Sequence, residues 1–153
     1  MPATALIKRA MQRYWRLSRG LTVAVYACVF DSESRVLLVH HAGDDAWHFP
    51  GGGALMTEAF EDALNRHLAF PSGIVMNGRP HLFGLYANCG APSGDHVALY
   101  VVRTWHHADD GGDIQSRDIS RFFAIRDLPE NINPQTDQRI AEIIEARSPA
   151  GMW

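Results

Sequence analysis

The chain is poor in cysteine and carries no surplus of positive charge. Its 153 residues include two cysteines, Cys28 and Cys89, too few for a disulfide framework or a cysteine-based zinc site. Lysine and arginine total 14 against 17 aspartate and glutamate, which gives a net charge of −3. A general nucleic-acid binder needs the opposite balance, so we expect no nucleic acid among the partners of this protein.

Long apolar runs are also missing. No stretch reaches the roughly 20 residues of a membrane-spanning helix, and the start of the chain lacks the apolar segment of a secretory signal. Hydrophobic residues nevertheless make up 46% of the chain, which is enough for a packed core. We expect a cytoplasmic protein with one domain over residues 1–153, divided into an N-terminal helix (1–20), a core (21–147) and a tail (148–153).

The N-terminal segment Thr4–Arg19 has the pattern of an amphipathic helix. It holds five of the 14 basic residues and no acid. Its apolar side can pack on the domain while its basic side is solvated. The alternative is a targeting peptide or a membrane-surface helix.

Strands and helices alternate along the rest of the chain. The predicted strands are Leu21–Phe30, Val36–His41, Ile74–Asn88, His96–Trp105 and Phe122–Ile125. Turns are expected at residues 90–94 and 127–129, and a flexible acidic loop at residues 109–113. This mixture predicts an α/β fold with a mixed β-sheet covered on both faces by helices.

Two helices belong to this predicted core. The first starts near Glu58 after a Thr57 N-cap, and its buried stripe is Phe60, Ala63, Leu64 and Leu68, widened by Phe70. The last helix has Asn133 as its N-cap and Pro134 at its first position, and it is expected to bury Ile140, Ile143 and Ile144.

A glycine loop and the first core helix carry the most specific motif. The run Trp47-His48-Phe49-Pro50-Gly51-Gly52-Gly53 is followed by Glu58, six residues after Gly52, and then by Arg66 and Gly73-Ile74. The sequence therefore resembles the Nudix hydrolase family, whose box has this spacing. The resemblance covers roughly residues 21–146 and implies an α/β/α sandwich. It also implies a magnesium-dependent pyrophosphohydrolase of nucleoside diphosphates linked to another moiety.

The acids of that box are missing. Members of the family hold magnesium with carboxylates on one helix face, at the positions that His67, Phe70 and Pro71 occupy here. Phenylalanine and proline offer no donor atom, and an imidazole suits zinc or nickel better than magnesium. Pro71 should also end the helix near Ala69 or Phe70. The resemblance implies magnesium, but these residues do not support it, and His67 is the remaining metal candidate.

Other acids do not replace the missing ones. Glu61 and Asp62 lie in the first helical turn on a different side from His67, where acidic side chains are favourable and solvated. Asp118 is a candidate for an acid supplied from outside the box. His106 and His107 stand near Asp109, Asp110 and Asp113, which is either a metal cluster or a solvated loop.

Seven residues are candidates for the site. For catalysis they are Glu58, Arg66 and His67, and for substrate binding His40, Trp47, Gly52 and Gly53. The resemblance makes Glu58–Arg66 an architectural pair, with Glu58 as a base or ligand as the alternative. His40, beside His41, either contacts phosphate or is simply exposed, and Trp47 either stacks on a ligand or packs on the core.

Three classes of function remain open on the sequence. The first is a hydrolase of this family whose magnesium-dependent activity is absent or severely reduced, which we favour. The second is a module that binds a nucleotide or another phosphate-containing small molecule without hydrolysing it. The third is a partner-binding protein, and the resemblance also allows a homodimer.

Overall fold

The computed structural model describes residues 21–88, 96–109 and 117–153. The predicted N-terminal helix, the turn at 90–94 and residues 110–113 of the acidic loop lie outside the described residues. Within the described part of the chain, no helix is long and apolar enough to cross a bilayer.

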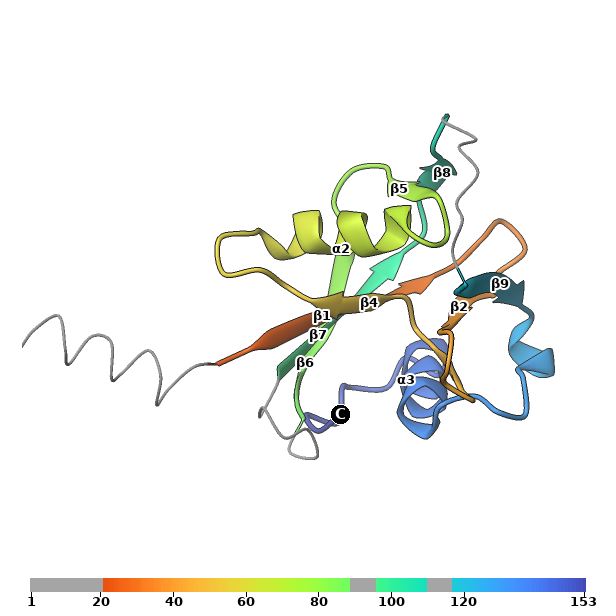
Figure 1. The fold of residues 1–153 in the computed structure, drawn as a ribbon. Coiled ribbons are helices and arrows are strands. Elements are labelled where there is room, and N and C mark those ends of the chain that lie inside the picture. Colours follow the sequence, from red (N-terminus) through yellow and green to blue (C-terminus); the bar gives the residue numbers. More distant parts are fainter. Residues whose placement is uncertain (1–20, 89–95, 110–116) are drawn as a thin grey trace, which may run out of the picture.

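A four-stranded mixed sheet forms the centre of the protein, as the sequence predicts (Figure 1). The inner strands β1 (Val23–Val29) and β7 (His96–Val102) run parallel to each other. The outer strands β4 (Gly51–Gly53) and β6 (His81–Ala87) are antiparallel to their neighbours. Because β1 and β7 lie inside the sheet and are covered on both faces, both are rich in apolar residues.

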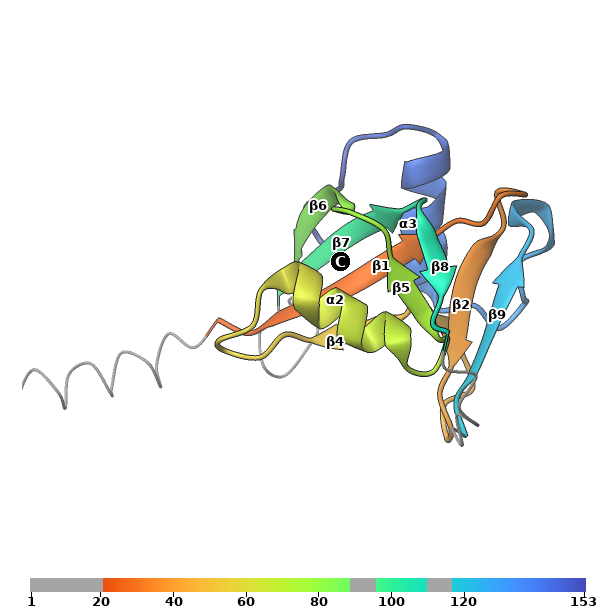
Figure 2. The same ribbon diagram turned by 90° about the horizontal axis from the view of Figure 1, so that it is seen from above.

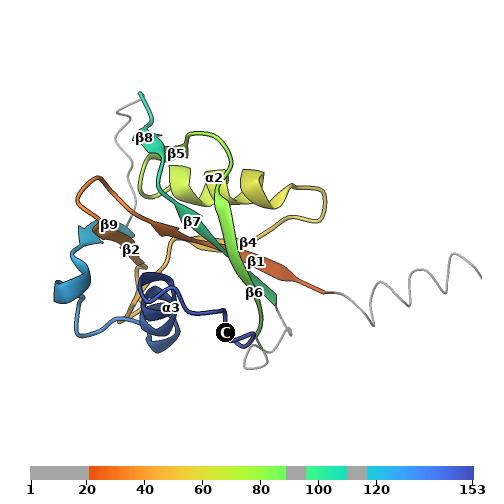
Figure 3. The ribbon, with the colours of Figure 1, turned by 180° about the vertical axis from the view of Figure 1, so that it is seen from behind.

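Helices cover the two faces of this sheet. Helix α2 (Phe60–Ala69) lies on one face and α3 (Pro134–Ile144) on the other, as Figures 1 and 3 show from opposite sides. The core consists of two hydrophobic clusters, one between the sheet and α2 and one between the sheet and α3. Successive residues of β1 point to opposite faces, so Ala27 belongs to the cluster on the α2 side and Cys28 to the cluster on the α3 side. The architecture is an α/β/α sandwich.

Short strands flank the central sheet (Figure 2). The antiparallel strands β3 (Trp47–His48), β2 (Val36–His40) and β9 (Ile119–Phe123) form a second sheet in that order. Strand β5 (Ile74–Met76), which follows α2, pairs with β8 (Trp105–His107).

Several predicted strand limits are wrong. The segment predicted as one strand over residues 74–88 forms β5 and β6, because Gly78 has a φ of +77° and Pro80 lacks the N–H that a ladder needs. The strand predicted from His96 to Trp105 ends at Val102, and Trp105 belongs to β8. Strand β9 covers residues 119–123 instead of 122–125, and a 3₁₀-helix follows over Ile125–Asp127, where part of a turn was predicted.

The start of α2 also differs from the prediction. The helix begins at Phe60, with Ala59 at the N-cap position and no side-chain cap, so Thr57 does not cap it. The side chain of Glu58 instead accepts a hydrogen bond from Leu55 N–H, which holds residues 55–58 in a turn. The helix ends at Ala69, and Phe70 is extended, as Pro71 predicts.

The buried stripe of α2 is narrower than predicted. Ala63, Leu64 and Leu68 are buried, but Phe60 is 37% exposed and Phe70 is 53% exposed. Because the chain turns away from the helix at Phe70, its ring does not reach the core.

Helix α3 has the predicted start and a different buried face. Asn133 Oδ1 accepts hydrogen bonds from the N–H groups of Gln135 and Thr136 at 3.0 and 3.1 Å. Ile140 is buried as expected, whereas Ile143 is half-buried and Ile144 is 48% exposed. The buried polar residues Thr136, Arg139 and Glu142 share the inner face with Ile140.

Candidate functional site

Residues 47–53, the glycine loop of the sequence motif, contain strands β3 and β4, and Gly51–Gly53 of β4 contacts both β1 and α2. Gly51 pairs with Tyr26 of β1, and a Cβ atom at Gly51 would lie 2.6 Å from the Tyr26 ring. A Cβ atom at Gly52 would lie 2.5 Å from Cε1 of His67. At Gly51 the close atoms include the backbone of β1, so this position has no room for a side chain. At Gly52 the His67 ring would have to move to admit one.

Glu58 and Arg66 clamp this loop onto α2. Arg66 Nε donates to Glu58 Oε1 at 2.8 Å and Arg66 Nη2 to Oε2 at 2.7 Å, which is a bidentate pair. The same guanidinium donates to the Gly53 carbonyl at 3.2 Å. The hydrogen bonds from Arg66, followed by the one from Leu55 N–H, lower the pKa of Glu58 to about 2. Glu58 is thus held ionised, and its two oxygens are engaged with protein donors.

The clamp predicts a specific response to acid. The pKa of Glu58 is depressed in the folded protein, so its stabilising effect is complete above the ordinary pKa of 4.5 and is lost as the pH falls toward about 2. We expect Arg66→Ala to lower the melting temperature at neutral pH. Between pH 4.5 and about pH 2, the melting temperature of this variant should fall less than that of the parent protein. Melting curves between neutral pH and about pH 2 measure this.

Glu61→Ala is the matched control for the clamp. Glu61 contacts the exposed Arg79 at 3.4 Å, and we expect its removal to leave the melting temperature nearly unchanged. If Arg66→Ala and the parent protein lost stability in parallel on acidification, the clamp would not be the source of the acid dependence.

His67 fills the space between the glycine loop and the helix. Its ring lies against Gly52, and its Nε2 is 3.1 Å from the Gly53 carbonyl oxygen. Phe70 is exposed and Pro71 is half-buried, and neither carries a donor atom. In the described part of the chain, no group of three or more histidine, cysteine or acidic side chains could hold a metal ion. The side chains of His67, Phe70 and Pro71 carry no oxygen atom, so these three box positions do not fit magnesium, which requires oxygen ligands.

A pocket opens beside the glycine loop. We call it the box-side pocket; its volume is about 350 Å³, and its lining consists of Tyr26, His48, Phe49, Asn88, Asn133, Gln135, Thr136 and Trp153. It adjoins the loop because His48 and Phe49 directly precede Pro50-Gly51 and Tyr26 pairs with Gly51. The Trp153 ring stacks on Tyr26 with a centroid distance of 5.4 Å.

Sequence reasoning missed most of this pocket. Only His48 and Phe49 stand within the motif, whereas Asn88, Asn133 and Trp153 arrive from distant parts of the chain. The predicted N-cap at Asn133 was the one sequence signal for this pocket, because the start of a helix gathers the capping side chain and unpaired backbone N–H groups in one place. Its nearness to the glycine loop depends on how α3 packs.

The predicted binding residues His40 and Trp47 do not line the box-side pocket. Their rings contact each other at 5.3 Å, and Trp47 packs edge-on against Phe123 at 4.9 Å. Trp47 is half-buried against the α3-side cluster, which agrees with the packing alternative for this side chain.

Asp118 lies beside His41 at the end of β2. His41 Nδ1 is 3.0 Å from Asp118 Oδ2, and Ala42 N–H donates to Asp118 Oδ1 at 2.9 Å. The Ala42 hydrogen bond, followed by the one with His41, lowers the pKa of Asp118. A second pair, His48 with Asp44, has a distance of 2.8 Å and stands at the edge of the box-side pocket.

The histidines of β8 make local contacts. His106 Nδ1 is 2.7 Å from Asn77 Oδ1, and the His107 ring packs against Trp105. The acids at 110 and 113 lie outside the described residues, and the histidines and acids that are described form no metal cluster.

A buried polar network supports the far wall of the box-side pocket. Arg139 and Glu142 are paired at 2.9 Å, and the Tyr86 hydroxyl donates to Glu142 at 3.1 Å. Arg139 also donates to the Met152 carbonyl at 2.6 Å, next to Trp153. The network thereby links α3 to the segment that holds the Trp153 ring. Sequence analysis did not identify it.

Comparison with solved structures supports the fold described above. An ADP-ribose pyrophosphatase from Streptococcus suis shows 17% identity and a TM-score of 0.62, over 86% of this chain and 96% of its own. A MutT NUDIX hydrolase from Burkholderia pseudomallei shows 24% identity and a TM-score of 0.61, over 78% of this chain and 94% of its own. A UDP-X diphosphatase shows 15% identity and a TM-score of 0.65, over 84% of this chain and 65% of its own.

These similar structures establish the fold. Membership of a family is decided by the sequence. No curated protein sequence matches the chain. The sequence pattern of the NUDIX domain, however, matches residues 20–148, which is most of the chain. The protein therefore belongs to the NUDIX domain family.

Proposed function

We propose that this protein binds a phosphate-linked nucleoside at the glycine loop and the box-side pocket, and that its magnesium-dependent hydrolase activity is absent or severely reduced. The observation that carries this proposal is the position of His67. Its imidazole lies against Gly52, at a box position where the family uses a carboxylate, and Phe70 and Pro71 add no oxygen donor.

The chemistry of the two neighbouring regions supports a nucleoside ligand. Tyr26 and Trp153 offer aromatic surfaces for a base, and Asn88 and Gln135 offer amides for hydrogen bonds. A volume of about 350 Å³ is in the range of small-molecule sites. Gly52 and Gly53 are our candidates for phosphate contact, with Glu58 and Arg66 as positioning residues. The structural relatives named for ADP-ribose and UDP-X indicate the class of ligand to test.

We expect magnesium to bind with a dissociation constant in the millimolar range or weaker, which corresponds to about −4 kcal/mol. The reason is that positions 67, 70 and 71 provide no carboxylate. Calorimetric titration with magnesium, followed in parallel by amide NMR shifts around the glycine loop, measures this. A micromolar site at Gly52 and Gly53 would restore the enzyme hypothesis.

Ligand binding is tested separately from metal binding. We expect ADP-ribose or a UDP-sugar, without metal, to shift the amide signals of Tyr26, His48 and Gln135, with no product formed after magnesium is added. Efficient magnesium-dependent hydrolysis would contradict the loss of activity. An absence of shifts in this pocket would remove the ligand-binding function.

One observation favours partner binding as the second candidate. Phe70 is 53% exposed directly after α2, where the family has an acid. If neither nucleotide produced shifts, this exposed ring would make a protein partner or a homodimer the better hypothesis.

A further inference from the structure

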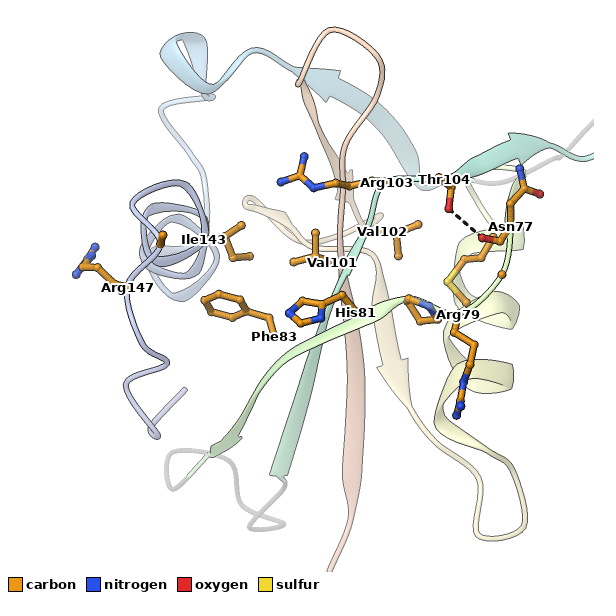
Figure 4. A pocket seen from close by; sticks show the side chains of 14 residues that line it. Asn77, Arg79, His81, Phe83, Val101, Val102, Arg103, Thr104, Ile143 and Arg147 are labelled. Carbon is orange, nitrogen blue, oxygen red and sulfur yellow. Dashed lines mark hydrogen bonds between the residues drawn. The ribbon is translucent and has the colours of Figure 1, made fainter.

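A second pocket lies at the other end of α3. It has a volume of about 500 Å³ and opens where β7 ends and β6 begins (Figure 4). The box-side pocket takes residues from the N-terminal end of α3, whereas this one takes Ile143, Ala146 and Arg147 from the C-terminal end and beyond. We call it the arginine-rimmed pocket, because Arg79, Arg103 and Arg147 are among its lining residues.

The interior of this pocket is apolar. Phe83 of β6, Val101 of β7 and Ile143 of α3 belong to the cluster on the α3 side of the sheet. In Figure 4 the Phe83 side chain extends toward α3, and Val101 and Ile143 lie beside it. All three residues line the pocket, so a flat apolar group bound there would contact apolar side chains from β6, β7 and α3. At the opposite side of the pocket from α3, the Thr104 hydroxyl donates to the Asn77 carbonyl at 2.9 Å. This hydrogen bond joins the segment after β7 to the segment after β5.

The rim is cationic and has no acid of its own. None of the 14 lining side chains is aspartate or glutamate. Arg79 and Arg147 are each paired with a carboxylate outside the pocket, Glu61 at 3.4 Å and Glu145 at 2.7 Å. Among the described residues, Arg103 has no carboxylate partner, and its guanidinium lies 4.5 Å from the centre of the Phe30 ring.

Arg103 is therefore the charge available to a ligand. Figure 4 shows its side chain extending across the upper edge of the pocket toward α3, while Arg79 and Arg147 point outward. The His81 ring lies between Phe83 and Arg79 in the same view. One guanidinium beside an apolar surface matches one carboxylate on an aromatic body, because arginine binds carboxylates with two parallel hydrogen bonds.

We propose that the arginine-rimmed pocket is a second ligand site, which binds a small aromatic carboxylate. The ring lies on the surface of Phe83, Val101 and Ile143, and the carboxylate accepts hydrogen bonds from Arg103. This site is independent of the function proposed above, since the two pockets share no lining residue.

Naphthoate is the probe, with the neutral naphthyl alcohol and inorganic phosphate as its matched controls. We expect naphthoate to bind with a submillimolar dissociation constant and to shift the amide signals of Gly78, Val102 and Ile143. The alcohol lacks the charge and phosphate lacks the ring, so each should bind at least about tenfold more weakly. Calorimetry gives the affinities and NMR gives the location.

Arg103→Gln tests the assigned cation. We expect it to weaken naphthoate binding at least about tenfold while leaving the alcohol unaffected. Arg126→Gln removes the same charge from an exposed arginine of the 3₁₀-helix and should change neither affinity. Arg103 is exposed, so its variant should fold, and its melting curve verifies this.

Four results would overturn the proposal. They are equal binding of naphthoate and its alcohol, shifts confined to the box-side pocket, unchanged naphthoate affinity in Arg103→Gln, and undetectable binding of naphthoate at millimolar concentration.

Discussion

Replacing Arg139 with methionine is expected to lower the free energy of unfolding by about 3–5 kcal/mol, which is the usual cost of leaving a buried charge without its partner. Arg139 has no solvent exposure and Glu142 is 2% exposed, and the two are 2.9 Å apart. Among the residues that the structure describes, the substitution leaves the buried Glu142 carboxylate with the Tyr86 hydroxyl as its one side-chain donor. Urea denaturation at neutral pH measures the change.

Two further variants identify the cause of this loss. Adding Glu142→Leu to Arg139→Met removes the unpaired charge, so we expect the double variant to recover a large part of the stability. Arg126→Met, at an exposed site, should change the unfolding free energy by less than about 0.5 kcal/mol. A loss below about 1 kcal/mol for Arg139→Met would show that the ion pair is not a stabilising element.

Arg139→Met should also affect the box-side pocket, which Trp153 lines. Arg139 donates to the Met152 carbonyl, and its guanidinium lies 6.0 Å from the Trp153 ring. Its loss should therefore loosen the Trp153 segment as well as α3. Tryptophan fluorescence below the unfolding transition reports this local change.

Restoring the carboxylates is expected to tighten magnesium binding by at least about tenfold, or 1.4 kcal/mol. The triple variant His67→Glu, Phe70→Glu and Pro71→Glu would place three acids on one helix face beside the glycine loop. Removing the imidazole also frees the space over Gly52. Without Pro71, α2 can extend beyond Ala69. Calorimetric titration of parent and triple variant in parallel measures the gain.

Replacing Phe70 in this variant is expected to lower the stability of the fold only modestly. Losing a buried phenylalanine costs about 3–5 kcal/mol, but Phe70 is 53% exposed and should contribute far less. The control is the triple glutamine variant, which has a similar shape and no charge, and it should not gain affinity.

The outcomes separate the three classes of function. A gain in metal affinity with turnover of ADP-ribose or a UDP-sugar indicates a site that lacks only its acids. A gain in affinity without turnover favours the ligand-binding module. A folded triple variant with unchanged affinity contradicts the assumption that the cleft can accept a metal, and it favours partner binding.

Features that depend on short distances along the chain could be predicted from the sequence. The spacing of Gly52, Glu58 and Arg66 indicated the family. The resemblance to that family in turn implied that Glu58 and Arg66 pair, and the structure contains this pair. The same motif showed that the box acids are missing. The Asn133 cap and the end of α2 before Pro71 follow equally from local backbone chemistry.

Features that depend on packing were decided by the tertiary structure. Apolar periodicity suggested that Ile144 faces the core, but α3 instead buries Arg139 and Glu142, because Tyr86 and the Met152 carbonyl stand opposite them. Both pockets likewise join residues from distant segments. Local sequence determines which element forms and where it ends, whereas the rotation of a helix on the sheet depends on partners that only the folded chain brings near.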